Sequence, residues 1–242
     1  GPQGGDALAQ RLALRPDAAG RLLDAAVSLR LLARRGGGRY GLGALGATLV
    51  GNPALLSLIE HHALLYEDLR DPLALLRQGP GQGALAQYWP YAGAADPARL
   101  EAPRVARSSA LMSDSQPLVA DEILDAYPLH RHRCLLDVGG GEGGFLAAAA
   151  RRAPALRLML FDLPAVAERA RVRLANAGLA QRASVHSGSF LHDPLPGGAD
   201  LVSLVRVLHD HDDEVVLRLL REVARVLPAD GRVLIAEPMS GT

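Results

Sequence analysis

The stretch Leu135–Gly144, with the sequence LLDVGGGEGG, decides the fold of this 242-residue chain. An apolar run contains Asp137 near its end, and Gly139, Gly141 and Gly143 follow at every second position. The pattern is typical of a buried β-strand that turns directly into a helix. Glycine lets the backbone of such a turn approach a ligand without a Cβ atom in the way, and the N-terminus of the next helix adds favourable dipole character.

Two classes of ligand fit this loop. Gly139, Gly141 and Gly144 satisfy the G-x-G-x-x-G pattern of dinucleotide sites. Asp137 favours a different ligand, because a carboxylate at the strand tip complements the cationic end of S-adenosylmethionine better than it complements a pyrophosphate. We therefore predict S-adenosylmethionine as the cofactor, with a dinucleotide enzyme and a glycine-rich turn without any ligand as the alternatives.

The chain after His130 alternates short apolar runs with amphipathic segments, which indicates βαβ units and a parallel sheet. The last expected strand lies directly before the end of the sequence. A doubly wound fold of this kind normally continues further, so we expect the C-terminal part of the domain to be missing. The expected strands cover 134–138, 157–161, 183–187, 201–205 and 232–236, and the expected helices cover 145–152, 165–177 and 213–226.

The first half, from Asp6 to about Tyr127, shows helical periodicity broken by glycine and proline. Its order of elements is like that of a winged helix, and the boundary with the α/β half is expected near 127–133. The expected elements are a helix pair over 17–35, a glycine-rich hairpin over 35–43, a short helix over 42–50, helices over 53–77 and 115–126, and breaks at 79–83 and 96–97.

Composition excludes several classes of protein. The 26 basic and 26 acidic side chains balance, so no net field favours nucleic acid. The sequence contains no lysine, which argues against Schiff-base chemistry, pyridoxal phosphate and a Walker-type phosphate site. The single cysteine, Cys134, lies in an apolar run and is expected to be a buried structural thiol, in keeping with a reducing cytoplasmic compartment.

Asp162 ends the second expected strand, in the segment Leu160–Pro164. An acidic side chain at this strand tip can accept hydrogen bonds from both ribose hydroxyls of an adenosine. The alternative is that Asp162 caps the helix that follows Pro164. Both roles can coexist.

His209 lies just past the fourth expected strand, at the edge where open α/β sheets bind ligands. Histidine ordinarily titrates near neutrality, so His209 is the best candidate for a base that removes a hydroxyl proton as the oxygen attacks a sulfonium methyl group. Glu237 closes the fifth strand and is placed to orient His209 if the two strand tips are neighbours. A solvated glutamate at a strand end is the alternative.

The other histidines give weaker evidence of a functional role. His211 and the surrounding aspartates make a metal site conceivable, but Asp212 and Asp213 are better explained as the N-cap and first turn of the next helix. His130 and His132 lie among arginines, where solvated side chains are expected. We therefore predict no metal ligand.

Taken together, these segments resemble the plant-type family of small-molecule O-methyltransferases over nearly the whole chain. The resemblance implies a Rossmann-like class I methyltransferase domain over 129–242 and a mainly helical, winged-helix-like dimerisation domain over 1–128. The segments that carry it, in the family's order and spacing, are Asp137–Gly143, Phe161–Pro164, Leu208–Asp210 and Ala236–Pro238.

In such enzymes the histidine that matches His209 is the base, and the acidic residue that matches Glu237 orients it. The aspartate that matches Asp162 binds the cofactor ribose. The full set of predicted cofactor-binding residues is Asp137, Gly139, Gly141, Asp162, Leu163, Ser189, Phe190 and Arg206.

Two departures from the family pattern narrow the resemblance. Ser189 and Phe190 stand where the family usually has an aspartate and a hydrophobic residue beside the adenine, and His211 replaces a tryptophan. The change at His211 looks like the bacterial carotenoid branch, of demethylspheroidene type, whose members methylate the tertiary 1-hydroxyl of acyclic carotenoids. The segments that share this likeness are Met112–Gln116, Val205–Asp213 and Glu237–Thr242. A phenolic or polyketide acceptor is the alternative.

The partners follow from the same resemblance: a small hydroxylated acceptor and a second copy of the chain, bound through the N-terminal domain. A cytoplasmic enzyme is expected, with peripheral contact to the inner membrane if the acceptor is lipophilic. A winged-helix DNA-binding regulator is a remote alternative, because the N-terminal arginines are spread around the helices and form no single basic face.

Overall fold

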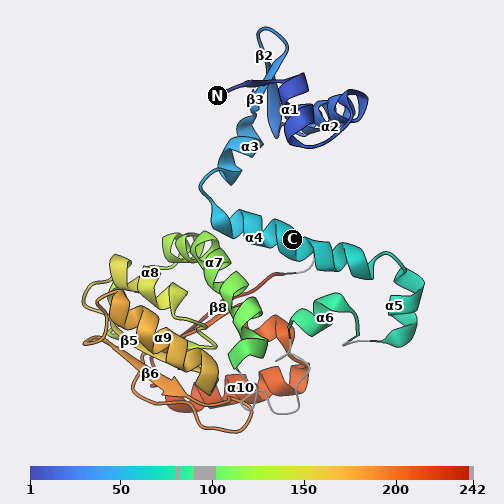
Figure 1. The fold of residues 1–242 in the computed structure, drawn as a ribbon. Helices are drawn as coiled ribbons and strands as arrows, with labels where there is room; N and C mark the ends of the chain where they lie inside the picture. Colours follow the sequence, from blue (N-terminus) through green and yellow to red (C-terminus); the bar gives the residue numbers. More distant parts are fainter. Residues whose placement is uncertain (80–81, 90–101, 240–242) are drawn as a thin grey trace. The chain divides into compact units, whose positions relative to one another are not determined.

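The computed structural model describes residues 1–79, 82–89 and 102–239 (Figure 1). The chain divides into two compact units, Gly1–Glu60 and His61–Thr242. Within the described ranges, we find no helix with the length and apolar character needed to cross a membrane.

The first unit combines short helices with a small antiparallel sheet of strand order β1-β3-β2. Its hairpin confirms the glycine-rich turn, because Gly37 and Gly38 adopt φ values of 71° and 67° that suit glycine. The elements are β1 (Gln3–Gly4), α1 (Gly5–Arg11), α2 (Pro16–Ser28), β2 (Leu32–Arg35), β3 (Arg39–Leu42) and α3 (Ala44–Leu49).

The prediction of a second helix before residue 35 is wrong. Residues 32–35 form β2, paired with β3 from Leu32↔Leu42 to Arg35↔Arg39. The apolar spacing of this segment is compatible with a helix, but the tight turn brings β3 alongside and supplies backbone partners. Strand pairing therefore overrides the local helical pattern.

The helices between residues 53 and 126 differ from the prediction in their ends. The single helix expected over 53–77 is two helices, because Asp71 caps a new helix that starts at Pro72 and accepts a hydrogen bond from the N–H of Ala74 at 3.0 Å. The helix expected over 115–126 is the end of a longer one. These elements are α4 (Pro53–Asp68), α5 (Pro72–Gln78), α6 (Ala84–Tyr88) and α7 (Ala102–Ala126).

The expected breaks are only partly described. The break at 79–83 includes residues 80–81, and the break at Asp96-Pro97 falls wholly within 90–101; both ranges lie outside the described residues.

The second unit contains the predicted parallel sheet, in the order β6-β5-β4-β7-β8. All five strands are confirmed, and the three helices between them are confirmed to within a residue at each end. The elements are β4 (Cys134–Val138), α8 (Gly144–Arg152), β5 (Arg157–Asp162), α9 (Pro164–Asn176), β6 (Ala183–Ser187), β7 (Leu201–Val205), α10 (Asp213–Val226) and β8 (Arg232–Ala236), with single turns η2 (Leu129–Arg131) and η3 (Leu208–Asp210).

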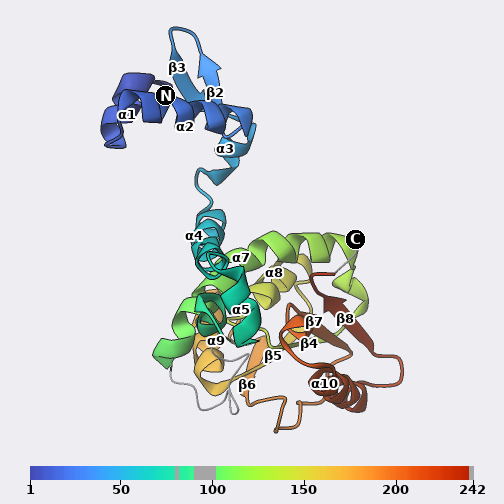
Figure 2. The same ribbon diagram turned by 90° about the vertical axis from the view of Figure 1, so that its right-hand side faces the viewer.

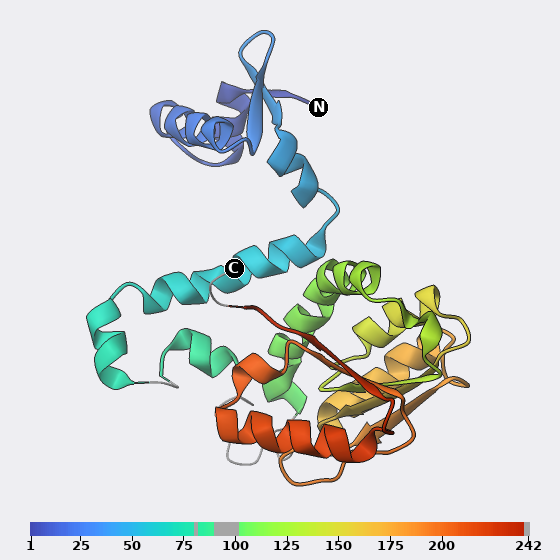
Figure 3. The same ribbon diagram turned by 180° about the vertical axis from the view of Figure 1, so that it is seen from behind.

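Helices cover both faces of this sheet, as Figures 2 and 3 show for α8 and α10 on either side of β4 and β7. One core cluster joins the sheet to α7, α8 and α9 through side chains such as Leu124, Phe145 and Leu174. The other joins it to α10 through Leu219 and Val223. Burial on both faces explains why β4 and β7 are nearly continuous apolar runs.

The division at residue 60 differs from the domain boundary expected near residue 128. Ala120 and Leu124 of α7 are buried in the same core as α8, so α7 packs as part of the sheet-bearing unit. The change from helical to alternating pattern near residue 130 marks the start of the sheet, and helices that precede a sheet in sequence can still cover it.

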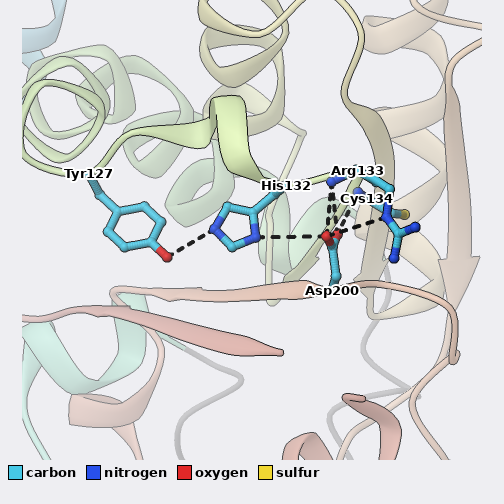
Figure 4. A network of polar contacts seen from close by, with 5 residues as sticks. All are labelled: Tyr127, His132, Arg133, Cys134 and Asp200. Atoms are coloured by element: carbon cyan, nitrogen blue, oxygen red, sulfur yellow. Dashed lines mark hydrogen bonds and ion pairs between the residues drawn. The ribbon is translucent and has the colours of Figure 1, made fainter. Parts of the chain in front are cut away.

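A polar network ties the start of β4 to the start of β7, at the opposite edge of the sheet from the strand tips considered below (Figure 4). Asp200 accepts hydrogen bonds from the N–H groups of Arg133 at 3.0 Å and Cys134 at 2.7 Å. His132 lies 3.9 Å from Asp200 and shares a hydrogen bond of 3.0 Å with the hydroxyl of Tyr127. The expectation of a solvated His132 is wrong, because its side chain is only 10% exposed.

Burial by itself would raise the pKa of Asp200, but the hydrogen bonds from the backbone of Cys134 and Arg133 outweigh it and hold this pKa below its usual range. Cys134 itself is a buried free thiol, as predicted, and burial raises its pKa.

We expect Asp200→Ala to lower the free energy of unfolding by about 1–3 kcal/mol at pH 7, because it leaves the N–H group of the buried Cys134 and that of the exposed Arg133 without their acceptor. A carboxyl whose folded pKa is depressed contributes stability above its unfolded pKa of about 3.9 and loses it as pH falls through the folded pKa. Urea titrations should therefore show the difference from wild type shrinking in strong acid.

The matched control is Asp230→Ala, at an exposed carboxylate in the turn before β8. An equal loss of stability in both variants, or a loss for Asp200→Ala that does not change with pH, would contradict this role.

Candidate functional site

A cleft of about 1050 Å³, its open mouth included, lies at the carboxyl ends of β4, β5 and β7. This is where the strand order reverses, because β4 pairs with β5 on one side and with β7 on the other. Open α/β sheets bind ligands at such switch points. All eight predicted cofactor-binding residues line the cleft, together with Met112, Ser113, Gln116, Gly140, Glu142, Gly144, Val166, Leu191, Val205, Val207, Asp210 and His211.

The glycine loop between β4 and α8 needs its glycines for different reasons. Gly139 has a φ of 67°, and a Cβ atom there would lie 2.8 Å from Cγ2 of Val207. A Cβ atom at Gly140 would lie 2.6 Å from Oδ2 of Asp137. At Gly141, with a φ of 57°, a Cβ atom would meet nothing within 4 Å. Gly141 therefore faces the open cleft, whereas Gly139 and Gly140 pack against the protein.

Asp137 is buried beneath this loop, with 1% of its surface exposed. Its Oδ1 accepts a hydrogen bond of 2.5 Å from the hydroxyl of Ser203, and its Oδ2 has no hydrogen-bond partner among the described residues. Burial raises the pKa of Asp137 to about 7; the bond from Ser203 lowers it and the charge of Asp162 raises it. A carboxyl with one unpartnered oxygen at a cleft suits a cationic or hydrogen-bond-donating ligand.

Asp162 holds the loop from the tip of β5. Its Oδ2 accepts a hydrogen bond from the N–H of Gly141 and its Oδ1 accepts one from the N–H of Leu163, each at 2.7 Å. Burial raises the pKa of Asp162 to about 6, against the effect of these two bonds. The N-cap of α9 is Leu163, without a side-chain cap, so the structure does not bear out the capping alternative.

The two departures from the family pattern meet in one wall of the cleft. The rings of Phe190 and His211 pack edge to face with centroids 5.2 Å apart. Burial lowers the pKa of His211, which favours the neutral ring. Ser189 is buried, and its hydroxyl accepts a hydrogen bond of 3.3 Å from the N–H of Leu191.

Arg206 follows β7 and directs its side chain to α7. Its guanidinium donates to the hydroxyl of Ser115 at 3.0 Å, to the carbonyl of Met112 at 3.2 Å and to the side chain of Gln116. It also adopts a φ of 56°, which is uncommon for a residue with a Cβ atom. Arg206 therefore shapes the cleft through its contacts with α7.

His209 and Glu237, which the sequence places 28 residues apart, are brought together at the tips of β7 and β8. The Nδ1 atom of His209 lies 2.6 Å from Oε2 of Glu237. The other oxygen of Glu237 accepts hydrogen bonds of 2.8 Å from the N–H groups of Val207 and Leu208. The Glu237 side chain is 7% exposed, so it is not the solvated strand-end glutamate considered as the alternative.

This geometry leaves Nε2 of His209 as the nitrogen available to a reacting group. The side chain of His209 is 39% exposed, and Nε2 lies 3.4 Å from Oδ1 of Asp210. Burial raises the pKa of Asp210, partly offset by His209 and His211. Neither His209 nor Glu237 lines the cleft, but Asp210 and His211, the next residues along the chain, do.

Two contributions were missing from the predicted site. Helix α7 supplies Met112, Ser113 and Gln116 to the cleft, and Ser203 supports Asp137 from β7. The sequence signals were a cluster of polar residues near 112–116 and one serine in an otherwise apolar strand. Within the ranges that the structure describes, no group of three or more His, Cys, Asp or Glu residues is arranged to hold a metal ion.

We expect Gly139→Ala to destabilise the protein more than Gly141→Ala. Both place a Cβ atom in the left-handed region, at a cost of about 1–2 kcal/mol, but only Gly139→Ala also displaces Val207 and adds an overpacking cost of about 1–3 kcal/mol. Urea unfolding measures the difference. Gly178→Ala, with a φ of 74° and nothing within 4 Å of the added Cβ atom, controls for the backbone cost alone; equal losses in all three variants would contradict the close packing at Gly139.

Comparison with known proteins agrees with this geometry. A family model described as an O-methyltransferase domain matches residues 66–242. The chain is 49% identical to the demethylspheroidene O-methyltransferase of Cereibacter sphaeroides, over 100% of the chain and 63% of that protein, and 42% identical to the protein of the same name from Rhodobacter capsulatus, over 97% and 57%. It therefore spans less than two thirds of the length of either relative.

A solved structure adds a bound cofactor to the comparison. An O-methyltransferase from neocarzinostatin biosynthesis, crystallised with S-adenosylmethionine and 2-hydroxy-5-methyl naphthoic acid, superposes with a TM-score of 0.65 at 30% identity. The match covers 96% of this chain and 72% of that one. The α/β half of this chain thus has the class I S-adenosylmethionine-dependent methyltransferase fold.

Proposed function

Because this chain belongs to the O-methyltransferase domain family, we propose that it transfers a methyl group from S-adenosylmethionine to a hydroxyl oxygen of a small molecule. The observation that carries the proposal is the contact of 2.6 Å between His209 and Glu237 beside the cleft. The pair provides a base where a hydroxyl proton has to leave.

The residues of the cleft fit the cofactor. Asp137, Asp162, Glu142 and Asp210 make the lining acidic, with Arg206 as its only arginine among the described residues, and this suits a ligand that carries sulfonium and ammonium groups. Asp137 would face the cationic part through Oδ2, and Asp162 would serve the ribose. When bound, S-adenosylmethionine supplies an electrophilic methyl group; the remaining predicted residues, with Gly141 at the open face, would hold it in place.

The base acts through one nitrogen. Glu237 accepts the Nδ1–H of His209, so the ring presents the lone pair of Nε2 to the acceptor hydroxyl. When the methyl group passes to the acceptor oxygen, its bond to the sulfonium sulfur would break and the sulfur would leave as the neutral thioether of S-adenosylhomocysteine. The hydroxyl proton would move to Nε2, and Glu237 would stabilise the positive charge on the ring. Two backbone N–H groups fix Glu237, so the carboxylate need not move during the reaction.

For the acceptor, we propose the tertiary 1-hydroxyl of an acyclic carotenoid. The support is the identity of 49% and 42% with two demethylspheroidene O-methyltransferases over nearly the whole chain. The alternative, a phenolic or polyketide acceptor, is supported by the naphthoic acid in the neocarzinostatin relative.

A panel of hydroxycarotenoids and phenols, incubated with methyl-labelled S-adenosylmethionine, tests the acceptor. We expect label in the carotenoids that carry a tertiary 1-hydroxyl and none in the matched compounds that lack it. Label in phenols alone would replace the carotenoid with the alternative, and label in no compound while the cofactor binds would argue against the reaction.

A homodimer through the N-terminal unit completes the proposal. It is supported by large apolar side chains that this unit leaves exposed: Leu12, Leu14, Leu22, Leu29, Leu42, Leu45, Val50, Leu56 and Ile59. A cytoplasmic location, with peripheral membrane contact for a lipophilic acceptor, and the absence of a nucleic-acid partner stay predictions.

We expect His209→Ala to lower the methylation rate about 10²–10⁴-fold, the usual contribution of a general base, and to leave the affinity for S-adenosylhomocysteine within about twofold. Product formation and calorimetry measure the two quantities, and NAD serves as the ligand that should not bind. His192→Ala, at an exposed histidine, is the matched control. Equal loss of rate and affinity would mean that His209 has a structural role.

A further inference from the structure

Ser203 is a polar residue in the middle of a strand that is otherwise apolar. Strand β7 has the sequence LVSLV, and Ser203 is fully buried. Its partner in the parallel pairing of β4 and β7 is Asp137. The Ser203 hydroxyl donates a hydrogen bond of 2.5 Å to Oδ1 of Asp137. The serine at this position of the strand therefore binds the Asp137 carboxyl.

This bond determines which oxygen of Asp137 is left without a hydrogen-bond partner among the described residues. With Oδ1 engaged by Ser203, the unpartnered Oδ2 remains, and it lies where a Cβ atom on Gly140 would approach to 2.6 Å. The absence of a side chain at Gly140 therefore keeps room beside this oxygen. A buried carboxylate with one oxygen held and the other free is arranged to receive a donor from a ligand.

The charged groups around Asp137 do little to stabilise its ionised form. Asp162 on β5 opposes its ionisation. Glu142, Asp210, His211 and Arg206 line the same cleft, and the guanidinium of Arg206 is directed to α7. Ser203 is the one side chain in the described part of the chain that hydrogen-bonds to this carboxyl.

We propose that Ser203 is a positioning residue for the cofactor: it orients Asp137 and stabilises its carboxylate form, so that binding of the cationic cofactor is coupled to ionisation of Asp137. The inference rests on the proposed function, because it takes the cofactor to be S-adenosylmethionine.

The direction of the pH effect follows from the state of Asp137. Its pKa near 7 means that below neutral pH much of the free protein carries the neutral acid. A cationic ligand favours the carboxylate, so binding in this range releases a proton and affinity rises with pH, by at most about tenfold per unit for one proton. Removal of the Ser203 hydroxyl raises the pKa further, so the rise in affinity moves to higher pH.

Calorimetric titration of the full chain with S-adenosylhomocysteine, which carries an ammonium group, tests the proposal between pH 6 and 8.5. Buffers of different ionisation enthalpy report the number of protons released. We expect wild type to gain about three- to tenfold in affinity from pH 6 to 8. Ser203→Ala should bind at least fivefold more weakly at pH 7 and approach wild type at pH 8.5.

Two further variants distinguish a positioning role of Ser203 from an effect on protein stability alone. Ser203→Cys, close in size but a weak donor, should fall between wild type and Ser203→Ala. Asp137→Asn cannot ionise, so its affinity should lack the change near pH 7, and adding Ser203→Ala to it should have no further effect. Titration of Asp162 or of the ligand's own ammonium group would affect all variants alike.

The outcomes are distinct. If Ser203→Ala lowers affinity by the same factor at every pH, or if wild type releases no proton on binding, the inference is overturned while the proposed function stands. If wild type binds no S-adenosylhomocysteine at any pH, the proposed function itself fails. Should Ser203→Ala not fold, Ser203→Cys takes its place as the test of Ser203, and the comparison of proton release between wild type and Asp137→Asn tests the coupling to ionisation of Asp137.

Discussion

The parallel pairing of β4 with β7 is the constraint on which the site depends. Their register places Asp137 opposite Ser203 and makes the strand tips that follow, with the glycine loop on one side and Arg206 on the other, immediate neighbours. Because strand order reverses between these two strands, the helices after them leave in opposite directions and a cleft opens between. This pairing places the glycine loop and Asp137 beside the segment that leads to His209, while β5, paired with β4, adds Asp162 and β8, paired with β7, adds Glu237.

The same arrangement explains why the site combines buried carboxyls with an exposed histidine. Asp137 and Asp162 lie under the loop, where burial raises their pKa values, and the cationic ligand of the proposed function would favour their charged forms. His209 lies on a single turn beyond β7, where its side chain is partly exposed, and it is oriented by its contact with Glu237. The proposed reaction needs one environment for a cationic cofactor and another for a neutral hydroxylated acceptor, and adjacent strand tips would provide both.

Prediction from sequence worked best where structure is local. The five strands of the parallel sheet, the glycine hairpin and the helices α8, α9 and α10 follow from patterns within about fifteen residues. It failed where another segment of the chain decides the local structure. Residues 32–35 form a strand because β3 pairs with them, and His132 is largely shielded from solvent beside Asp200, which lies 68 residues further along the chain. In α7, the packing of Ala120 and Leu124 onto the sheet could not be derived from their helical spacing.

The sequence by itself determined the chemistry available to this protein: a glycine loop preceded by Asp137, an acid at the second strand tip, and a histidine and a glutamate at the fourth and fifth. These are local signals, because residue type and position at a strand end suffice to recognise them. Only the tertiary structure decided that Glu237 bonds His209, that Arg206 holds α7 against the cleft and that Ser203 supports Asp137. Such contacts join residues 28 to 94 positions apart, and strand order and register, which no local pattern encodes, bring them together.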